Sequence, residues 1–350
     1  MALKICALLL SSISILLWTH GSYVAAFISL SSLSGDVKRS KVHVMPTDDI
    51  DIPIIFENDK LIAINKPPHV PHHDNPSTRQ LGIMSLIRAQ QHEQSNPRFR
   101  YPHRLWSVHR LDQVTSGILI FAKDSATAST LIGKFQRKEI KKYYTAVSGK
   151  KATKKKQGWV KGHMKLGRRG SYKLVNDYGN KKDTTKRTNG YAVTRFFTAG
   201  LGNLSMAPSL VHSLNNEEDK DHTPSLIPKT AILFEPHSGK THQLRVAAKS
   251  LAIPILGDLR YGGGCLKNII HDGDESTERG VDWNRTYLHA SAIHFQLDEH
   301  NISIWSPPEC FDHLFTGREM TNVFVKLMKK HCDCTPILDV IHKKQTPSNS

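Results

Sequence analysis

The sequence of 350 residues is poor in cysteine, and its few cysteines are unevenly spaced. They are Cys6, Cys265, Cys310, Cys332 and Cys334. This number and spacing exclude a disulfide framework in a chain of this length, so we expect a reducing compartment. Cys332 and Cys334 have histidines nearby, but no second cysteine pair at zinc spacing accompanies them, so we expect no metal ion there.

Motifs of several common enzyme classes are also missing. The chain has no P-loop, no dinucleotide-binding glycine pattern and no G-x-S-x-G nucleophile elbow, so a hydrolase that uses Ser116 with a histidine remains only an alternative. Five histidines stand at irregular spacing, mostly in proline-rich loops, and are interpreted as surface residues: His69, His72, His73, His103 and His109. We expect neither a metal nor a cofactor.

Acidic residues are scarce, with 31 aspartates and glutamates against 48 lysines and arginines, which gives a formal charge of +17. Between Lys134 and Arg195 the sequence has 20 basic residues and three acidic ones. A local field of this sign suits phosphate contacts, whereas solubility or targeting is the alternative explanation of the excess lysine. The residues of this stretch that we expect to contact phosphates are Lys141, Lys142, Lys154, Lys155, Lys156, Arg168 and Arg169.

Long apolar runs are missing too, apart from a serine-interrupted stretch from Ile5 to Trp18. With the small residues before Phe27 it has the layout of a signal peptide at residues 1–26, and an uncleaved anchor is the alternative. Residues 27–50 begin with a serine-rich, basic stretch of transit-peptide composition. The two segments together resemble the two-part presequence of algae with secondary plastids. We expect a plastid protein without stable membrane association after processing; another organelle or the secretory pathway is the alternative.

After residue 50 the sequence alternates between strand-like and helix-like segments. We expect strands at 52–56, 61–65, 118–122, 143–147 and 230–236, short strands with exposed basic loops up to residue 187, and helices at 81–91, after Asp124 and from the turn at 237–239 to Leu251. One domain is expected at 51–330, with a disordered insertion at about 198–229. Residues 331–350 are expected to form a C-terminal tail, which is expected to be dispensable from about Thr335.

The most informative segment runs from His109 to Lys123 and reads HRLDQVTSGILIFAK. It places Asp112 close to Arg110 in a loop that leads into a buried strand, which is how a rigid element holds a reactive group. A lone aspartate in a loop is more often a cap or turn residue. The whole segment, however, closely resembles the HRLD-x-x-T-S-G-x-L-x-x-A-K signature of the RluA-type pseudouridine synthases, and every fixed position is present.

Further segments resemble the same family in the right order. They are KYYTA at 142–146, HSGKTHQLRV at 237–246, PILGDLRYG at 254–262 and LHA at 288–290. The resemblance spans about residues 52–305 and implies an α+β fold with a mixed, mostly antiparallel central β-sheet, flanking helices and loops. One departure is His69, which stands where the family's N-K-P-x-G motif has glycine. The interval before residue 52 is too short for the family's frequent S4 RNA-binding domain, so RNA affinity must come from the catalytic domain.

The resemblance implies that the chain isomerises uridine to pseudouridine in structured RNA, ribosomal or transfer RNA, as a monomer. It assigns catalysis to Asp112, Tyr144 and Arg245, with Arg245 paired to the Asp112 carboxylate. Arg110 would fill the stack vacated by the flipped base, with His109 beside it among the RNA-binding residues. The sequence does not choose among attack on C1′, attack on C6 and loss of the base through a glycal. An RNA-binding protein that has lost catalysis would lack a catalytic residue, and none is replaced.

Overall fold

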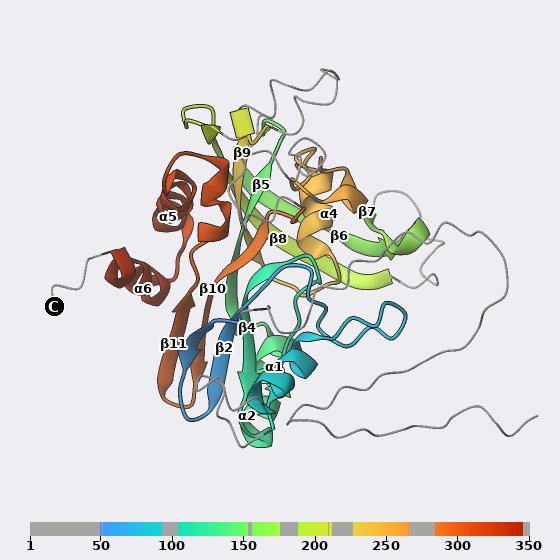
Figure 1. Ribbon diagram of the computed structural model, residues 1–350, viewed down its shortest axis with the longest axis vertical. Coiled ribbons are helices and arrows are strands. Elements are labelled where there is room, and N and C mark those ends of the chain that lie inside the picture. Colours follow the sequence, from blue (N-terminus) through green and yellow to red (C-terminus); the bar gives the residue numbers. More distant parts are fainter. Residues whose placement is uncertain are drawn as a thin grey trace, which may run out of the picture. The chain divides into compact units, whose positions relative to one another are not determined.

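The structure is a computed structural model that describes residues 50, 52–92, 104–152, 156–175, 188–208, 210–211, 227–264, 266 and 284–345. The presequence predictions, apart from residue 50, lie outside the described residues, as do Lys154 and Lys155. One sheet of eleven strands organises the described part of the chain (Figure 1). Its order is β1-β2-β4-β10-β5-β9-β8-β6-β7, with β11 paired to β10 and β3 paired to β4.

The strands confirm the predicted class of a mixed, mostly antiparallel sheet. They are β1 (Ile54–Glu57), β2 (Leu61–Lys66), β3 (Trp106–Ser107), β4 (Ser116–Ala122), β5 (Lys141–Ser148), β6 (Gln157–Leu166), β7 (Tyr172–Val175), β8 (Thr188–Gly200), β9 (Thr230–Pro236), β10 (Leu288–Leu297) and β11 (His300–Trp305). Neighbouring strands are antiparallel except for β4 and β10, which are parallel. β9 has the predicted bounds, whereas β6 and β8 are longer than the short strands expected from the lysine-rich stretch.

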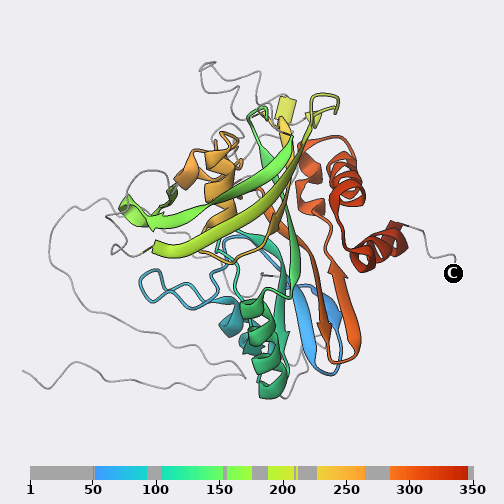
Figure 2. The same cartoon turned by 180° about the vertical axis from the view of Figure 1, so that it is seen from behind.

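Helices and short 3-10 turns pack along this sheet. The helices are α1 (Ile83–His92), α2 (Ser125–Arg137), α4 (Gln243–Ser250), α5 (Glu319–His331) and α6 (Thr335–Gln345). α2 begins as predicted, because the Asp124 carboxylate accepts a hydrogen bond from the Thr127 backbone N–H at 2.7 Å. Figure 2 shows β6 and β8 in front of α4, so α4 covers one face of these strands. Among the described residues no helix is both long and apolar enough to cross a membrane.

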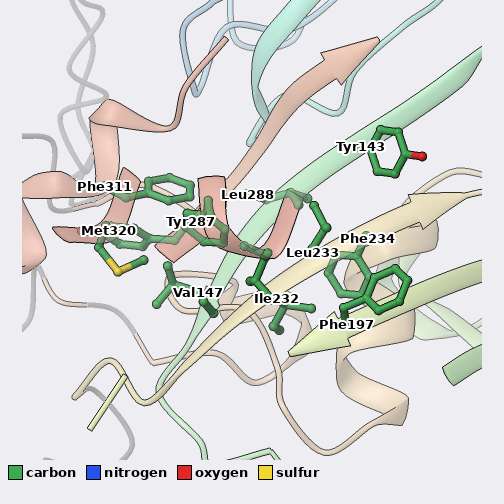
Figure 3. Close-up of a cluster of buried hydrophobic side chains, with 14 of the residues drawn as sticks. Tyr143, Val147, Phe197, Ile232, Leu233, Phe234, Tyr287, Leu288, Phe311 and Met320 are labelled. Carbon is green, nitrogen blue, oxygen red and sulfur yellow. The ribbon is translucent and has the colours of Figure 1, made fainter. Parts of the chain in front are cut away.

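The largest buried cluster joins β5, β8 and β9 to the C-terminal helices (Figure 3). It extends into α6, where Ile337 and Ile341 have no exposed surface. The predicted end of the domain at residue 330 is therefore wrong, because the chain up to α6 packs into the core. A short amphipathic helix outside the recognised motifs gave too weak a pattern to be distinguished from an exposed tail.

The predicted insertion at 198–229 is also corrected at its N-terminal end. β8 continues to Gly200, and beyond it Leu201, Ala207 and Leu210 are buried in the main cluster. The Ala207 backbone N–H donates to the Leu314 carbonyl at 3.2 Å. The part of the predicted insertion at 212–226 lies outside the described residues.

Candidate active site

Two loops and the start of a helix line a cavity of about 420 Å³. The loops are residues 71–76, between β2 and α1, and residues 110–114, between β3 and β4. α4 contributes Arg245 and its N-cap residue His242, and Arg260 completes the wall. Small-molecule sites in proteins occupy roughly 300–1,000 Å³, so a single nucleoside is a suitable occupant.

Asp112 stands in the second loop, just before β4. Its backbone carbonyl accepts a hydrogen bond from the Thr115 N–H at 3.0 Å, which closes a turn. Its side chain is 19% exposed and lines the cavity, so the carboxylate is accessible from a fixed backbone. Arg110 is exposed and lines the same cavity. The structure thus places two residues of the HRLD segment at one cavity: Asp112, which the resemblance makes the catalytic residue, and Arg110, which would fill the stack that the flipped base leaves.

Gly117 connects this loop to the centre of the sheet. It pairs with Ala290 of β10, and Ala290 pairs on its other side with Tyr144 of β5. Gly117 has a φ of +107°, and a Cβ at this position would lie 2.4 Å from the Ala290 carbonyl oxygen. Glycine is therefore required here. Since paired strands lie about 4.8 Å apart, the backbones of Gly117 and Tyr144 are held about 10 Å apart across β10.

Arg245 is buried, with 5% of its surface exposed, so it is not a surface phosphate contact. Its Nε and Nη2 donate to Asp258 Oδ2 and Oδ1 at 2.7 and 2.8 Å. Its Nη1 lies 3.7 Å from Asp112 Oδ2, which is too long for a hydrogen bond but close enough for electrostatic attraction. The predicted pairing of Arg245 with Asp112 is therefore present as an ion pair, but it is not bidentate, because the Nε and Nη2 donors bind Asp258.

The charge of Arg245 is nevertheless fixed beside Asp112. Burial lowers the pKa of the Arg245 guanidinium, but the hydrogen bonds and charge of Asp258, with the charge of Asp112, outweigh burial and raise this pKa above its ordinary value. Asp258 thus keeps a permanent cation next to the proposed catalytic carboxylate. Asp258 belongs to the PILGDLRYG segment, but its role was not predictable, since the sequence does not show which of two acids an arginine meets.

Tyr144 lies in β5, half-buried, and contacts two of the apolar clusters. Burial raises the pKa of its phenol well above the ordinary value, and the negative charge of Asp112 raises it further. The phenol therefore keeps its proton at neutral pH. Tyr144 is not among the residues that line the cavity of Asp112; it lines a separate, smaller space with Lys142 and Ala290. Its predicted part in catalysis, with a ring face for the base and a hydrogen-bond donor for the sugar, stays a prediction.

His242 is a site residue that sequence analysis did not single out. Its backbone is left-handed, with a φ of 58°, and its Nδ1 lies 2.8 Å from the Tyr261 hydroxyl. That hydroxyl accepts the Tyr172 N–H at 2.9 Å, so its own hydrogen is available for Nδ1. Burial lowers the pKa of His242, with Arg245 among the charges that lower it and Asp112 opposing the effect. This contact suits the neutral tautomer in which Nδ1 accepts and Nε2 carries the proton.

Lys66 hydrogen-bonds to the backbone of both loops that line the cavity. It has no exposed surface, and its Nζ donates to the carbonyls of Pro67, Val70 and Gln113 at 2.7, 2.9 and 3.2 Å. Burial lowers its pKa to about 7, and the charge of Asp112 opposes this effect. The three acceptors match the three donors of an ammonium group. One lysine therefore ties the loop after β2 to the loop that carries Asp112.

The unusual His69 occupies a backbone position suited to glycine. Its φ is 65°, in the left-handed region, so the chain keeps the turn although the residue differs from the family motif. The His69 carbonyl accepts hydrogen bonds from Gln80 at 2.8 Å and Gln113 at 3.0 Å. These bonds connect the turn to both sides of the cavity.

Ser116 is buried and hydrogen-bonded, which removes the hydrolase alternative. Its Oγ lies 2.9 Å from His289 Nδ1 and accepts a hydrogen bond from Arg285 Nη2 at 2.7 Å. With 3% of its surface exposed, Ser116 has no access for a substrate acyl group. The group instead fixes the start of β4 against β10.

Two predicted RNA-binding residues, His109 and Lys142, pack on Phe135. His109 Nε2 accepts the Ile120 N–H at 3.0 Å, and its ring stacks on Phe135 with centroids 4.7 Å apart. Burial lowers the pKa of His109 to about 3, so the ring is neutral. Lys142 lies over the same Phe135 ring, and burial lowers its pKa to about 8. The sequence did not show that these two side chains pack on Phe135, and the predictions that they bind RNA stay predictions.

The other predicted basic residues of the described part are exposed. Lys141 Nζ lies 3.3 Å from Asp333, so its charge is partly compensated. Lys156, Arg168 and Arg169 are exposed. The Arg169 carbonyl accepts a hydrogen bond from Arg260 Nη1 at 2.8 Å, which brings this turn to the cavity wall. The predictions for these residues stay predictions.

The paired cysteines near the C-terminus belong to the core. Cys332 and Cys334 are buried, and the Cys334 N–H donates to Cys332 Sγ at 3.4 Å. Within the described ranges no group of three or more histidine, cysteine or acidic side chains could hold a metal ion.

Comparisons with known proteins agree with this geometry. The family model described as RNA pseudouridylate synthase matches residues 60–250. An uncharacterized RNA pseudouridine synthase of Haemophilus influenzae is 31% identical over 274 residues, which cover 76% of this chain and 95% of the relative. The tRNA pseudouridine synthase C of Haemophilus ducreyi is 27% identical, covering 70% of this chain and 86% of the relative.

The chain is also similar to a synthase named for ribosomal RNA and to a solved human structure. The ribosomal large subunit pseudouridine synthase D of Vibrio parahaemolyticus is 28% identical, covering 71% of this chain and 64% of the relative. The solved structure of human RNA Pseudouridylate Synthase Domain Containing 4 superposes with a TM-score of 0.51 and 19% identity, covering 75% of this chain and 92% of that chain. This structural likeness supports the fold.

Proposed function

Since the chain belongs to the RluA-type family of RNA pseudouridine synthases and isomerises uridine in RNA, we propose that Asp112 is its catalytic carboxylate. The observation that carries the proposal is the convergence of Asp112, Arg110 and Arg245 on one cavity of about 420 Å³. Each is a residue type that the reaction requires, and a loop and a helix far apart in the sequence bring them together.

The reaction is a rearrangement within one nucleotide. The N1–C1′ bond of uridine breaks, a C5–C1′ bond forms, and the proton of C5 is replaced by one on N1, so no redox partner is needed. The reacting atoms are inaccessible in a stacked helix, and the base must be flipped into the cavity. Asp112 then attacks C1′ or C6, or assists loss of the base through a glycal. Arg110, exposed at the cavity wall, is suited to occupy the vacated stack.

We assign distinct roles to the neighbouring side chains. Arg245, held by Asp258, stabilises the negative charge of Asp112 across 3.7 Å without competing for its oxygens. Tyr144 supports the base and donates from its protonated phenol. His242 presents an Nε2 proton that suits a uracil carbonyl. Lys66 is a positioning residue, because it acts through the backbone of the loop.

The test is Asp112→Asn, which preserves shape and removes the carboxylate charge. We expect RNA binding to persist while single-turnover formation of pseudouridine falls to below a few per cent of the wild-type rate. Asp74→Asn, also at the cavity but not assigned to chemistry, is the matched control. Substantial turnover by the Asp112 variant would refute the assignment.

We further propose that the substrate is ribosomal or transfer RNA and that the enzyme acts as a monomer. The relatives named above act on these two RNA classes according to their names. Mapping pseudouridines in organellar RNA with and without the gene would identify the target. Mass measurement of the purified chain in solution tests the oligomeric state.

The proposed location is a plastid, reached by a presequence that is removed so that no stable membrane association remains. The support is the order of an apolar segment and a serine-rich basic segment at residues 1–50. Residues 1–50 fused to a fluorescent reporter should direct it to plastids. Accumulation of the reporter outside the cell would favour the secretory alternative.

A further inference from the structure

The outer face of strands β6, β7 and β8 combines exposed aromatic rings with several lysines. In Figure 2, β6 and β8 lie in front of α4, so the face of these strands that is turned to the viewer is the one away from α4. Trp159 and Tyr191, on neighbouring strands of this face, are 48% and 45% exposed. Aromatic side chains of this size are usually buried, and the other large hydrophobic residues with comparable exposure in the described part are aliphatic.

Among the described residues, the cations of this face have few acidic neighbours. The sequences of β6, β7 and β8 contain no aspartate or glutamate. Lys165 and Lys173 stand directly opposite each other in the β6–β7 ladder, an arrangement that destabilises a sheet unless an anion neutralises it. The nearest acid across the sheet, Glu235 of β9, lies 3.6 Å from Arg195.

Each ring is held by a neighbouring imidazole, and about half of each aromatic residue stays exposed. The ring centroids of Trp159 and His237 lie 4.9 Å apart, and those of Tyr191 and His163 lie 5.1 Å apart. Trp159 pairs with Arg195, and Tyr191 pairs with His163, four residues further along β6. Since a strand advances about 3.3 Å per residue, the two aromatic positions lie about 13 Å apart. Lys161 Nζ lies 5.1 Å from the centre of the Trp159 ring, where it can contact a phosphate next to a stacked base.

We propose that this face, which we call the outer platform (Trp159, Lys161, Lys165, Lys173 and Tyr191), binds an unpaired segment of the RNA substrate. Exposed aromatics stack bases without regard to sequence, and lysines bind the backbone. The platform lies on the opposite face of the sheet from α4, so it holds RNA beyond the nucleotide in the cavity. The proposal rests on the RNA-directed function but does not require any particular catalytic residue.

The probe is a fluorescein-labelled single-stranded oligoadenylate of about ten nucleotides, within the usual site size of such surfaces. It contains no uridine, so it is not a substrate for isomerisation. We expect Trp159→Ala to weaken its binding about tenfold, Tyr191→Ala to have a similar effect and Trp159→Phe to retain most of the affinity. Ile132→Ala, at a 39% exposed position on α2, is the matched control.

A second measurement tests the charges. Replacing Lys165 and Lys173 by alanine should reduce the slope of log affinity against log salt by about 0.7 for each phosphate that is no longer neutralised. Lys326→Ala, on the exposed side of α5, should leave the slope unchanged. Melting temperatures near the wild-type value would establish that these surface variants fold.

The outcomes separate this proposal from the assignment of catalysis. Asp112→Asn should bind oligoadenylate as the wild type does, whether or not it still isomerises uridine. Wild-type affinity in a variant that carries both Trp159→Ala and Tyr191→Ala overturns the platform. A changed oligomeric state in that variant also overturns it, because the face would then belong to a contact between copies of the chain.

Discussion

Replacing Asp258 tests its role as the bidentate partner of Arg245. Asp258→Asn keeps the size of the side chain but removes the charge that faces a buried guanidinium, with 1% and 6% of the two side chains exposed. The loss of one partner of a buried ion pair costs about 3–5 kcal/mol of unfolding free energy. The guanidinium would then turn towards Asp112, its other carboxylate within 4 Å among the described residues. We therefore expect lower stability together with a slower single-turnover rate.

Denaturant unfolding and single-turnover isomerisation on saturating RNA measure the two effects. A variant with Arg245→Met and Asp258→Leu should recover much of the stability, since no unpaired charge is left, but not the rate. Asp312→Asn is the control, because this carboxylate accepts two hydrogen bonds from Thr321 away from the cavity. It should lose about 1 kcal/mol and keep the wild-type rate. An Asp258→Asn loss below about 1 kcal/mol with normal turnover would refute the reasoning.

Three further outcomes are expected. Gly117→Ala should lower both the melting temperature and the rate, because its Cβ would lie 2.4 Å from the Ala290 oxygen; a normal rate would contradict the proposed link between strand and loop. Truncation after Asp333 should destabilise the chain by several kcal/mol, since Ile337 and Ile341 each contribute about 1.5–3 kcal/mol; an unchanged denaturation midpoint would support a dispensable tail. Because the Lys66 pKa falls from 10.5 to about 7 on folding, the wild type should gain stability relative to Lys66→Met as pH rises from about 7 to 10.5, and parallel pH profiles would contradict this.

Local features were predictable from sequence where one segment determines them. The bounds of β9 follow from a short apolar run between turn residues, and the start of α2 follows from Asp124 as a capping residue. The placement of Asp112 and Arg245 at one cavity followed from the family resemblance. None of these predictions depended on which side chains, far apart in the sequence, contact each other in the fold.

The parts of the site that the sequence did not predict all depend on tertiary contacts. Arg245 had two acids to choose from, and only the fold brings Asp258 into its fork. His109 and Lys142 belong to motifs that contact RNA by analogy, yet both pack on Phe135. Side-chain direction in a loop or at a strand end is set by packing rather than by residue type.

Two residues near the site, Gly117 and Ala290, position the proposed catalytic residues through the backbone and not through a reactive side chain. Gly117 permits β4 to approach β10 closely enough for Ala290 to pair with it, and Ala290 in turn pairs with Tyr144. This row of three backbones connects the loop of Asp112 to the tyrosine. A shift of β10 would therefore move the carboxylate relative to the phenol. The close approach of β4 to β10 requires glycine at position 117. The spacing of the strands therefore determines how Asp112 and Tyr144 meet a flipped base.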